Sequence, residues 1–155
     1  MKVRLLAVGT RMPEWVNEGY LNYQKRLTDD VRLELVEITA GKRAKNTDIA
    51  RITEQEGAAQ LAALGANDHV VALEVGGKPI STESLADSLR LWLPQGRSVS
   101  LLIGGPEGLS LAAKQRADEQ WSLSRLTLPH PLVRILIAEQ VYRAWTLLKG
   151  HPYHR

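Results

Sequence analysis

Three glycines surround a Pro-Glu pair directly after a short apolar run, in residues 101–110 (LLIGGPEGLS). The apolar run predicts a buried strand, and Ser110 is a typical N-cap for a helix that follows it. Glycines at the carboxyl end of a strand let the backbone turn sharply and approach a ligand without an intervening Cβ. Open α/β sheets bind ligands beyond these strand ends, so residues 104–108, named the glycine loop, are a candidate binding site.

The composition of the glycine loop argues against a phosphate ligand. The loop lacks the Gly-Lys-Ser/Thr ending of a P-loop and the G-x-G-x-x-G spacing of a dinucleotide fold. Glu107, at its tip, would repel a phosphate. A neutral or cationic ligand therefore suits the loop better, and an enzyme that uses a phosphorylated nucleotide is the least favoured interpretation.

The composition of the chain is that of a globular protein. Its 155 residues are 44% hydrophobic and 24% charged, which predicts one domain over residues 1–155. The sequence has no cysteine, and its histidines lack metal-ligand spacing, so we expect no metal site. No apolar stretch approaches the roughly 20 residues of a membrane span, which predicts a cytoplasmic protein. Residues 125–155 carry five basic side chains and one acidic, which indicates either an anionic partner or a solvated surface.

Strand and helix patterns alternate along the chain. Strands are predicted at residues 3–8, 31–38, 69–75 and 99–103, with a partly extended segment at 121–128 and a turn at 76–79. Helices are predicted at residues 13–26, from a cap at Asn46 or Thr47 to 64, from a cap at Ser81 to 93, at 110–119 and at 132–148. This alternation predicts an α/β fold with a mainly parallel sheet and helices on both faces.

The last predicted helix is apolar over more than one face. The stripe at helical spacing consists of Val133, Ile137, Val141, Trp145 and Leu148. Such a helix is either enclosed in its own core or buried against a second subunit. Because a small sheet offers the helix only one face, we expect a homodimer.

Several blocks of sequence together resemble the SPOUT superfamily of methyltransferases. The blocks around the candidate binding site are residues 102–110, 121–128 and 129–145. Further blocks, similar to members that modify ribosomal RNA, are residues 7–10 (AVGT), 40–43 (AGKR) and 151–155 (HPYHR). The resemblance covers essentially the whole chain.

The resemblance implies a compact α/β domain with a C-terminal trefoil knot that holds S-adenosylmethionine. It also implies a homodimer in which the cofactor pocket of one subunit meets the other subunit. The implied reaction is N3 methylation of a pseudouridine in 23S ribosomal RNA of the large subunit, on the assembled ribosome. The alternative is a non-catalytic factor of the same fold that binds the ribosome or RNA, and binding of S-adenosylmethionine would distinguish the two.

For the cofactor, the resemblance implies a pocket built from three loops. Its residues are Leu73, Gly104, Gly105, Leu123, Ser124, Arg125, Leu126, Thr127 and Leu128. Taken singly, each leucine is equally well explained as a core residue. Glu107 either balances the sulfonium charge, orients the loop or is a carboxylate stabilised by the dipole of the following helix.

For catalysis, the weakly acidic N3 proton must leave, and a general base works best with a pKa near the ambient pH. Tyr153 and His154 are candidates to assist, and Arg155 can grip phosphate or stack on a base. His130, between two prolines, either faces the pocket or shapes the turn.

A basic segment supplies candidate RNA contacts away from the chemistry. Lys42, Arg43 and Lys45 suit phosphate binding, and Arg155 joins them as a candidate RNA-binding residue. The alternative for the three residues is an ordinary solvated loop, which a salt-dependent binding assay would distinguish.

Overall fold

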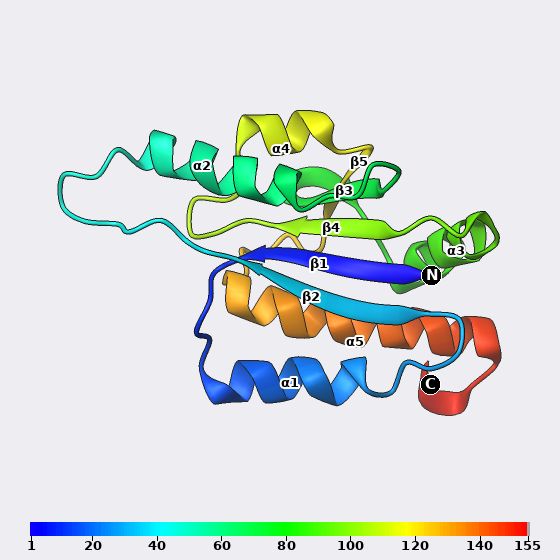
Figure 1. Cartoon of the computed structure of the whole chain (residues 1–155). Coiled ribbons are helices and arrows are strands. Elements are labelled where there is room, and N and C mark those ends of the chain that lie inside the picture. The colour runs from blue at the N-terminus through cyan, green and yellow to red at the C-terminus, as the bar shows by residue number, and fades with distance from the viewer. Residues whose placement is uncertain (155) are drawn as a thin grey trace.

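The computed structural model describes residues 1–154, so the predictions for Arg155 and for the side chain of His154 lie outside the described part. Its centre is a sheet of five parallel strands in the order β2-β1-β4-β3-β5 (Figure 1). The strands are β1 (Lys2–Val8), β2 (Arg32–Ile38), β3 (His69–Pro79), β4 (Val99–Ile103) and β5 (Glu119–Ser122). The predicted parallel sheet is confirmed.

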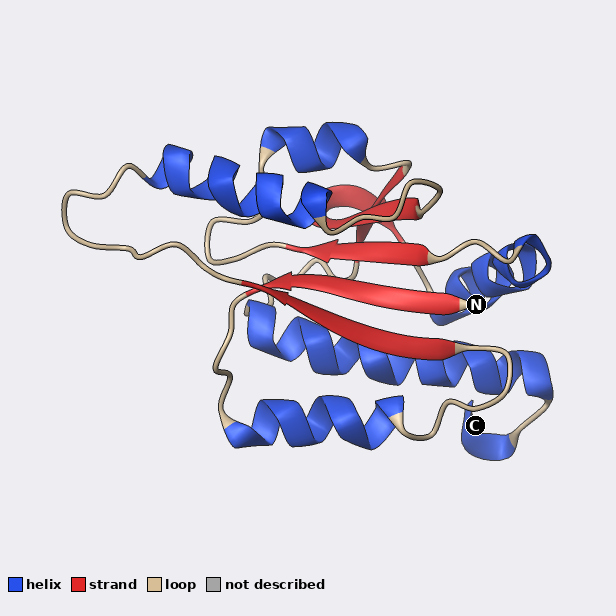
Figure 2. Cartoon of the chain, viewed as in Figure 1, coloured by secondary structure: helices blue, strands red, loops and turns tan. Residues whose placement is uncertain are grey.

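Helices cover both faces of the sheet, as predicted (Figure 2). The helices are α1 (Glu14–Gln24), α2 (Ile49–Ala62), α3 (Thr82–Trp92), α4 (Leu111–Arg116) and α5 (His130–Lys149), with 3-10 turns η1 (Leu93–Gln95) and η2 (Pro152–His154). Helices α1 and α3 pack against α5 on one face, and α2 packs against α4 on the other. Among the described residues, no helix is long and apolar enough to cross a membrane.

The central strands β1 and β4 are largely apolar because both of their faces are covered, with Lys2, Arg4 and Ser100 as their polar residues. Leu5 belongs to the larger core beneath α1, α3 and α5, whereas its neighbour Leu6 belongs to the smaller core beneath α2 and α4. In register, Leu101 of β4 lies beside Leu5. Burial of this pair of strands fixes the position at which the glycine loop leaves the sheet.

Two helix caps were predicted correctly and one was not. The side chains of Ser81 and Ser110 accept hydrogen bonds from the main-chain N–H groups of Ser84 and Ala113. Helix α2, in contrast, is capped by Asp48, which accepts from the N–H of Arg51, so the prediction of Asn46 or Thr47 was wrong. The three residues are all good caps, and local preference alone does not choose among them.

The predicted turn at residues 76–79 is also wrong, because β3 continues to Pro79. At Gly77, an ideal Cβ would lie 2.7 Å from main-chain atoms of Gln120 and Trp121, so only glycine lets β3 pass this close to β5. Pairing with β5 resumes between Lys78 and Trp121. The predicted segment 121–128 is correspondingly divided into the end of β5 and an irregular loop of residues 123–129.

Most of the apolar surface of α5 is buried within its own chain. Ile137, Val141 and Trp145 lie in the larger core, between the sheet and the neighbouring helices. Only Leu132 and Leu136, with 38% and 41% of their surface accessible, are exposed large apolar residues of this helix. The apolar pattern is therefore that of a core helix, and the homodimer stays a prediction.

Candidate functional site

A cavity of about 820 Å³ opens at the carboxyl end of β4, beside the point at which β3 stops pairing with β4, and is bordered by the 123–129 loop. Eight of the nine predicted cofactor residues line it: Leu73, Gly104, Gly105, Leu123, Ser124, Leu126, Thr127 and Leu128. Arg125 does not line it and is exposed. The structure thus brings the three predicted loops together, in a volume typical of small-molecule sites.

The topology of the sheet explains why this carboxyl-edge cavity forms where it does. From β3 the chain crosses to β4 through α3 on one face, whereas from β4 it crosses to β5 through α4 on the other (Figure 1). The two connections therefore diverge beyond the neighbouring ends of β3 and β4. Such points of divergence are the usual ligand sites of open parallel sheets.

The glycine loop is closed on itself. Gly105 and Gly108 form an isolated antiparallel bridge, and the N–H of Gly108 donates to the carbonyl of Gly105 at 2.9 Å. A Cβ on Gly104 would meet the main chain of Gly108, including its carbonyl oxygen at 2.6 Å. Gly108 has φ = +82°, in the left-handed region that favours glycine. Gly104 is therefore required by the closure of the loop itself.

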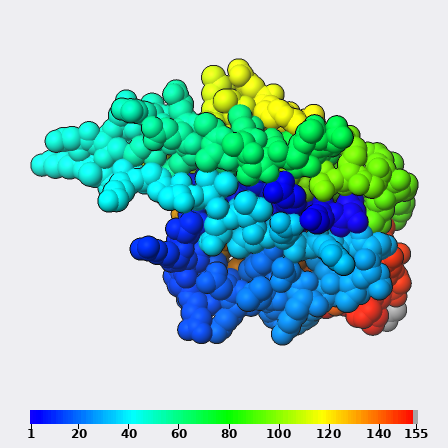
Figure 3. Space-filling model, in the orientation of Figure 1, coloured from blue at the N-terminus to red at the C-terminus, as the bar shows by residue number. Residues whose placement is uncertain are grey.

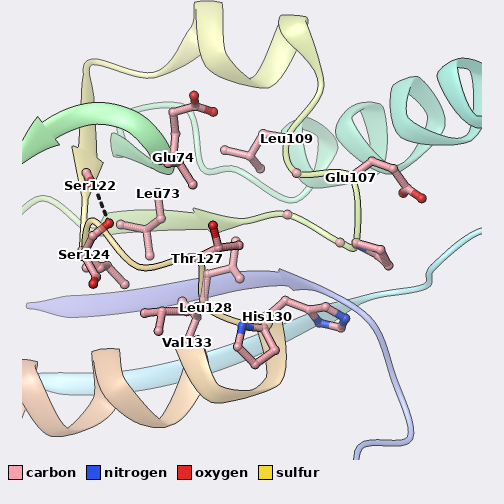
Figure 4. A pocket seen from close by; sticks show the side chains of 18 of the residues that line it. Leu73, Glu74, Glu107, Leu109, Ser122, Ser124, Thr127, Leu128, His130 and Val133 are labelled. Atoms are coloured by element: carbon pink, nitrogen blue, oxygen red, sulfur yellow. Dashed lines mark hydrogen bonds between the residues drawn. The ribbon is translucent and has the colours of Figure 1, made fainter.

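Glu107 is held by an ion pair with Arg43. The sequence suggested a contact with the sulfonium, a role in orienting the loop or a helix-dipole interaction for Glu107, but not this pair. Its carboxylate accepts from Nη2 and Nε of Arg43 at 2.6 and 3.0 Å. The Arg43 guanidinium, through these bonds, holds the pKa of Glu107 below its usual value. In Figure 4 the Glu107 carboxylate points away from the middle of the cavity.

The other charged residues that line the cavity are also neutralised. Glu74, in β3 just beyond the part of that strand that pairs with β4, pairs with Lys114 of α4 at 3.1 Å. Sequence analysis missed both, although Glu74 follows Leu73 directly and Lys114 lies one helical turn after the cap Ser110. Among the described lining residues, no cation is left unpaired to hold a phosphate group.

The 123–129 loop forms the apolar wall opposite the glycine loop. The Ser122 hydroxyl donates to the carbonyl of Ser124 at 3.1 Å, and the Ser124 hydroxyl accepts from the N–H of Leu126 at 2.9 Å. These bonds shape a turn that leaves Leu126 74% exposed. Leu128 and Leu73 also line the cavity, and in Figure 4 both lie on the side away from the Glu107 carboxylate.

His130 lines the cavity at the first residue of α5, so it both faces the pocket and follows the turn. Its Nδ1 is buried and has no hydrogen-bond partner among the described residues. Burial, followed by the positive charges of Arg134 and Arg43, lowers the pKa of His130. The imidazole is consequently neutral at neutral pH.

The C-terminal tail lies at the opposite end of α5 from the cavity. The helix has 20 residues, which corresponds to a length of about 30 Å. The Tyr153 hydroxyl donates to Glu139 at 3.2 Å, and its ring contacts Tyr142 edge to face. Burial, and then Glu139, raises the pKa of Tyr153 to about 12, so its phenol keeps its proton at neutral pH. Within one chain the structure does not bring Tyr153 to the cavity.

The predicted basic segment belongs to a projecting loop of residues 39–48, named the arm, between β2 and α2 (Figure 3). Lys42 and Lys45 are exposed on the arm. Arg43 differs from them because its guanidinium pairs with Glu56 as well as with Glu107. Of the three basic residues on the described arm, Lys42 and Lys45 therefore present free charge to a partner, whereas Arg43 does not.

The chain is similar to known proteins over its whole length. Two relatives, each called ribosomal RNA large subunit methyltransferase H, come from Methylococcus capsulatus and Pseudomonas fluorescens. Each is 59% identical to this chain over 155 residues, which cover 100% of both chains. Residues 1–154 also match the family described as predicted SPOUT methyltransferase. No group of three or more potential metal-ligating side chains occurs among the residues that the structure describes. The chain belongs to the SPOUT family of methyltransferases.

Proposed function

We propose that this protein methylates large-subunit ribosomal RNA with S-adenosylmethionine as the methyl donor, at N3 of a pseudouridine on the assembled ribosome. The names of its two full-length relatives support the class of substrate. The observation that carries the proposal is the carboxyl-edge cavity, where eight of the residues expected to bind the cofactor converge. A ribosomal substrate places the activity in the cytoplasm.

The cavity is chemically suited to S-adenosylmethionine. Leu73, Leu123 and Leu128 offer apolar surface for an adenine ring. The 123–129 loop lies outside any helix or strand, so no regular ladder consumes its main-chain donors and acceptors. The two basic side chains that line the cavity would not repel a positively charged sulfonium. Lys114 is paired with Glu74, and His130 is neutral.

When bound, the cofactor supplies a methyl group attached to a positively charged sulfur. The substrate nitrogen would approach the methyl carbon from the side opposite this sulfur, which is the leaving group. The work of the protein is to hold the two reacting atoms together and to exclude competing water. The glycine loop and the 123–129 loop would hold the donor from its two sides. Transfer of this methyl group from sulfur to N3 would release the N3 proton, which a base of the protein would have to receive.

His130 is the residue of this chain best suited to receive that proton. It is neutral and it borders the cavity. A neutral imidazole can accept a proton, whereas the Tyr153 phenol, with its raised pKa, cannot do so at neutral pH.

We further propose a homodimer, with a trefoil knot around the cofactor as in the superfamily that the sequence resembles. Because Tyr153 packs on Tyr142 and Glu139, and Glu139 lies about 14 Å along α5 from His130, Tyr153 does not reach the cavity of its own chain, and a tail that acts in catalysis must reach the cavity of a second copy. The tail residues Tyr153, His154 and Arg155 would then bind the RNA there. Exposed Leu132 and Leu136, close to the cavity end of α5, are candidates for the contact between copies.

Calorimetric titration with S-adenosylmethionine tests the proposal against the non-catalytic alternative. We expect saturable binding, and we expect a chain truncated after Pro152 to bind the cofactor equally well but to lose methylation of ribosomes. The full-length chain with Leu21→Ala, an exposed apolar change on α1, serves as a control with normal methylation. Absence of binding at millimolar cofactor would support a non-catalytic factor, and full activity of the truncated chain would remove the tail from the mechanism.

A further inference from the structure

One helix contacts the glycine loop and its flanks at three separate points. The Gln60 side chain donates to the carbonyl of Ile103, where β4 enters the loop, at 3.0 Å. Gly57 packs directly on Ser110, which follows the loop and begins α4. Glu56 reaches the loop tip indirectly, through Arg43. Helix α2 therefore supports the start, the tip and the end of the segment that lines the cavity.

Arg43 is the link at the tip, and it comes from the arm. Its Nη1 and Nη2 donate to the two carboxylate oxygens of Glu56 at 2.8 and 3.0 Å. The same Nη2 and its Nε donate to Glu107, 64 positions away in the sequence. The pair with Glu56 is bidentate, with two nitrogens on two oxygens, whereas the two close bonds to Glu107 meet at Oε2; together they fix the direction of the guanidinium as well as its position.

The base of the arm is fixed at the same place. Glu56, which is 4% exposed, also accepts from the N–H of Gly41 at 2.9 Å, and Arg43 donates to the carbonyl of Gly41. A Cβ on Gly105 would lie 3.4 Å from Arg43 Nη2 and 3.5 Å from Glu56 Oε1. The ion pairs thus pack directly against the backbone of the glycine loop.

We propose that Arg43 is a positioning residue that couples the arm to the glycine loop, so that cofactor binding and ordering of the arm favour each other. This inference rests on the proposed function, because it takes S-adenosylmethionine as the ligand of the cavity. A ligand that restrains the glycine loop restrains Glu107, which holds Arg43 and with it the residues that carry Lys42 and Lys45. Energetic coupling between two sites is reciprocal, so an RNA that holds the arm strengthens cofactor binding.

The role assigned to Arg43 differs from that of an ordinary surface cation. If Arg43 contributed only its charge, the Arg43→Lys variant would keep the full cofactor affinity. The coupling instead requires the planar fork, because an ammonium group cannot hold two carboxylates in this manner. Glu107→Gln breaks the link on the loop side and leaves the buried Glu56 paired, so this variant is expected to keep its fold.

The test measures cofactor affinity and hydrogen exchange of the arm in the full-length protein. We expect Glu107→Gln and Arg43→Lys each to weaken S-adenosylmethionine binding about fivefold or more. In the unmodified protein, S-adenosylmethionine slows exchange of the amides of residues 40–47, and in both variants this slowing is lost. Glu54→Gln removes an equal charge from an exposed position of α2 and leaves affinity and slowing unchanged.

The possible outcomes separate the two proposals. If the unmodified protein binds no S-adenosylmethionine, the proposed function fails and the coupling fails with it. If it binds but Glu107→Gln or Arg43→Lys matches it in affinity or in cofactor-induced slowing of the arm, the coupling is overturned while the proposed function stands.

Discussion

Arg134 and His130 stand one helical turn apart on α5, and both side chains lie against Gly9 at the end of β1. Arg134 is completely buried, with Nη1 on Glu37 at 2.8 Å and Nη2 on the carbonyl of Gly9 at 2.7 Å. A fixed positive charge thus lies beneath a cavity-lining imidazole. The arrangement favours the neutral imidazole, the form that can accept a proton.

Titration of His130 tests this relationship. Because burial and then Arg134 lower its pKa, we expect His130 to titrate below the usual value of about 6.5 in a proton–nitrogen NMR experiment. Folding then favours the neutral ring, so the contribution of His130 to stability is present above the unfolded pKa and decreases as pH falls below it. His130→Asn assigns the signal. A midpoint at or above 6.5 would contradict the account.

Replacement of Gly104 by alanine tests the closure of the glycine loop. The added Cβ meets the main chain of Gly108, so the loop must open, and we expect S-adenosylmethionine affinity to fall at least about tenfold. Gly96→Ala is the control, because its φ of +67° also strains an alanine, by about 1 kcal/mol, away from the cavity. We expect Gly96→Ala to lose thermal stability but to keep its affinity, and unchanged affinity in Gly104→Ala would remove the loop from the site.

The salt dependence of ribosomal RNA binding tests the two free lysines of the arm. With Lys42 and Lys45 both replaced by alanine, we expect the slope of log affinity against log salt to decrease by about two. Lys25→Ala, an exposed change near the end of α1, should leave the slope unchanged. An unaltered slope in the double variant would show that the arm is an ordinary solvated loop.

The end of α5 is tied to the loop before β2 through Asp30. Lys149 Nζ and Trp145 Nε1 lie 2.6 and 3.1 Å from its two carboxylate oxygens, and Lys149 is the main cause of its lowered pKa. A carboxylate with a lowered folded pKa stabilises the protein above its unfolded pKa of about 3.9, and the effect is lost as pH falls through the folded pKa.

We therefore expect Asp30→Asn to reduce the free energy of unfolding by about 0.5–1 kcal/mol at pH 7, a value limited by solvent screening of this half-exposed pair. The difference from the unmodified protein should shrink towards pH 2. Chemical denaturation at the two pH values measures it, with Asp29→Asn as the neighbouring control. An equal difference at both values would show that the charge has no role.

Local patterns predicted the elements that build the cavity. The apolar run of β4 followed by glycines placed a binding loop at a strand end, and the caps Ser81 and Ser110 fixed two helix starts. These features depend on residues close together in the sequence, where side-chain burial and capping act directly. The convergence of Leu73 with the 123–129 loop came instead from the family resemblance.

Contacts between distant segments could not be predicted in this way. The glycines at 76 and 77 read as a turn, but pairing with β5 overrides that local preference. Nothing in the sequence shows that Arg43 lies between Glu56 and Glu107, which it does only because the arm folds back along α2. The distance of Tyr153 from the cavity likewise depends on the direction of α5.

The most direct test of the central claim is methyl transfer to the proposed substrate. Purified ribosomes that lack the modification are incubated with the protein and S-adenosylmethionine carrying a labelled methyl group, and the modified nucleotide is then mapped. The account predicts one labelled pseudouridine, methylated at N3, in the large-subunit ribosomal RNA, and no label with the Gly104→Ala protein. Absence of label in the RNA, although the protein binds S-adenosylmethionine, would contradict it.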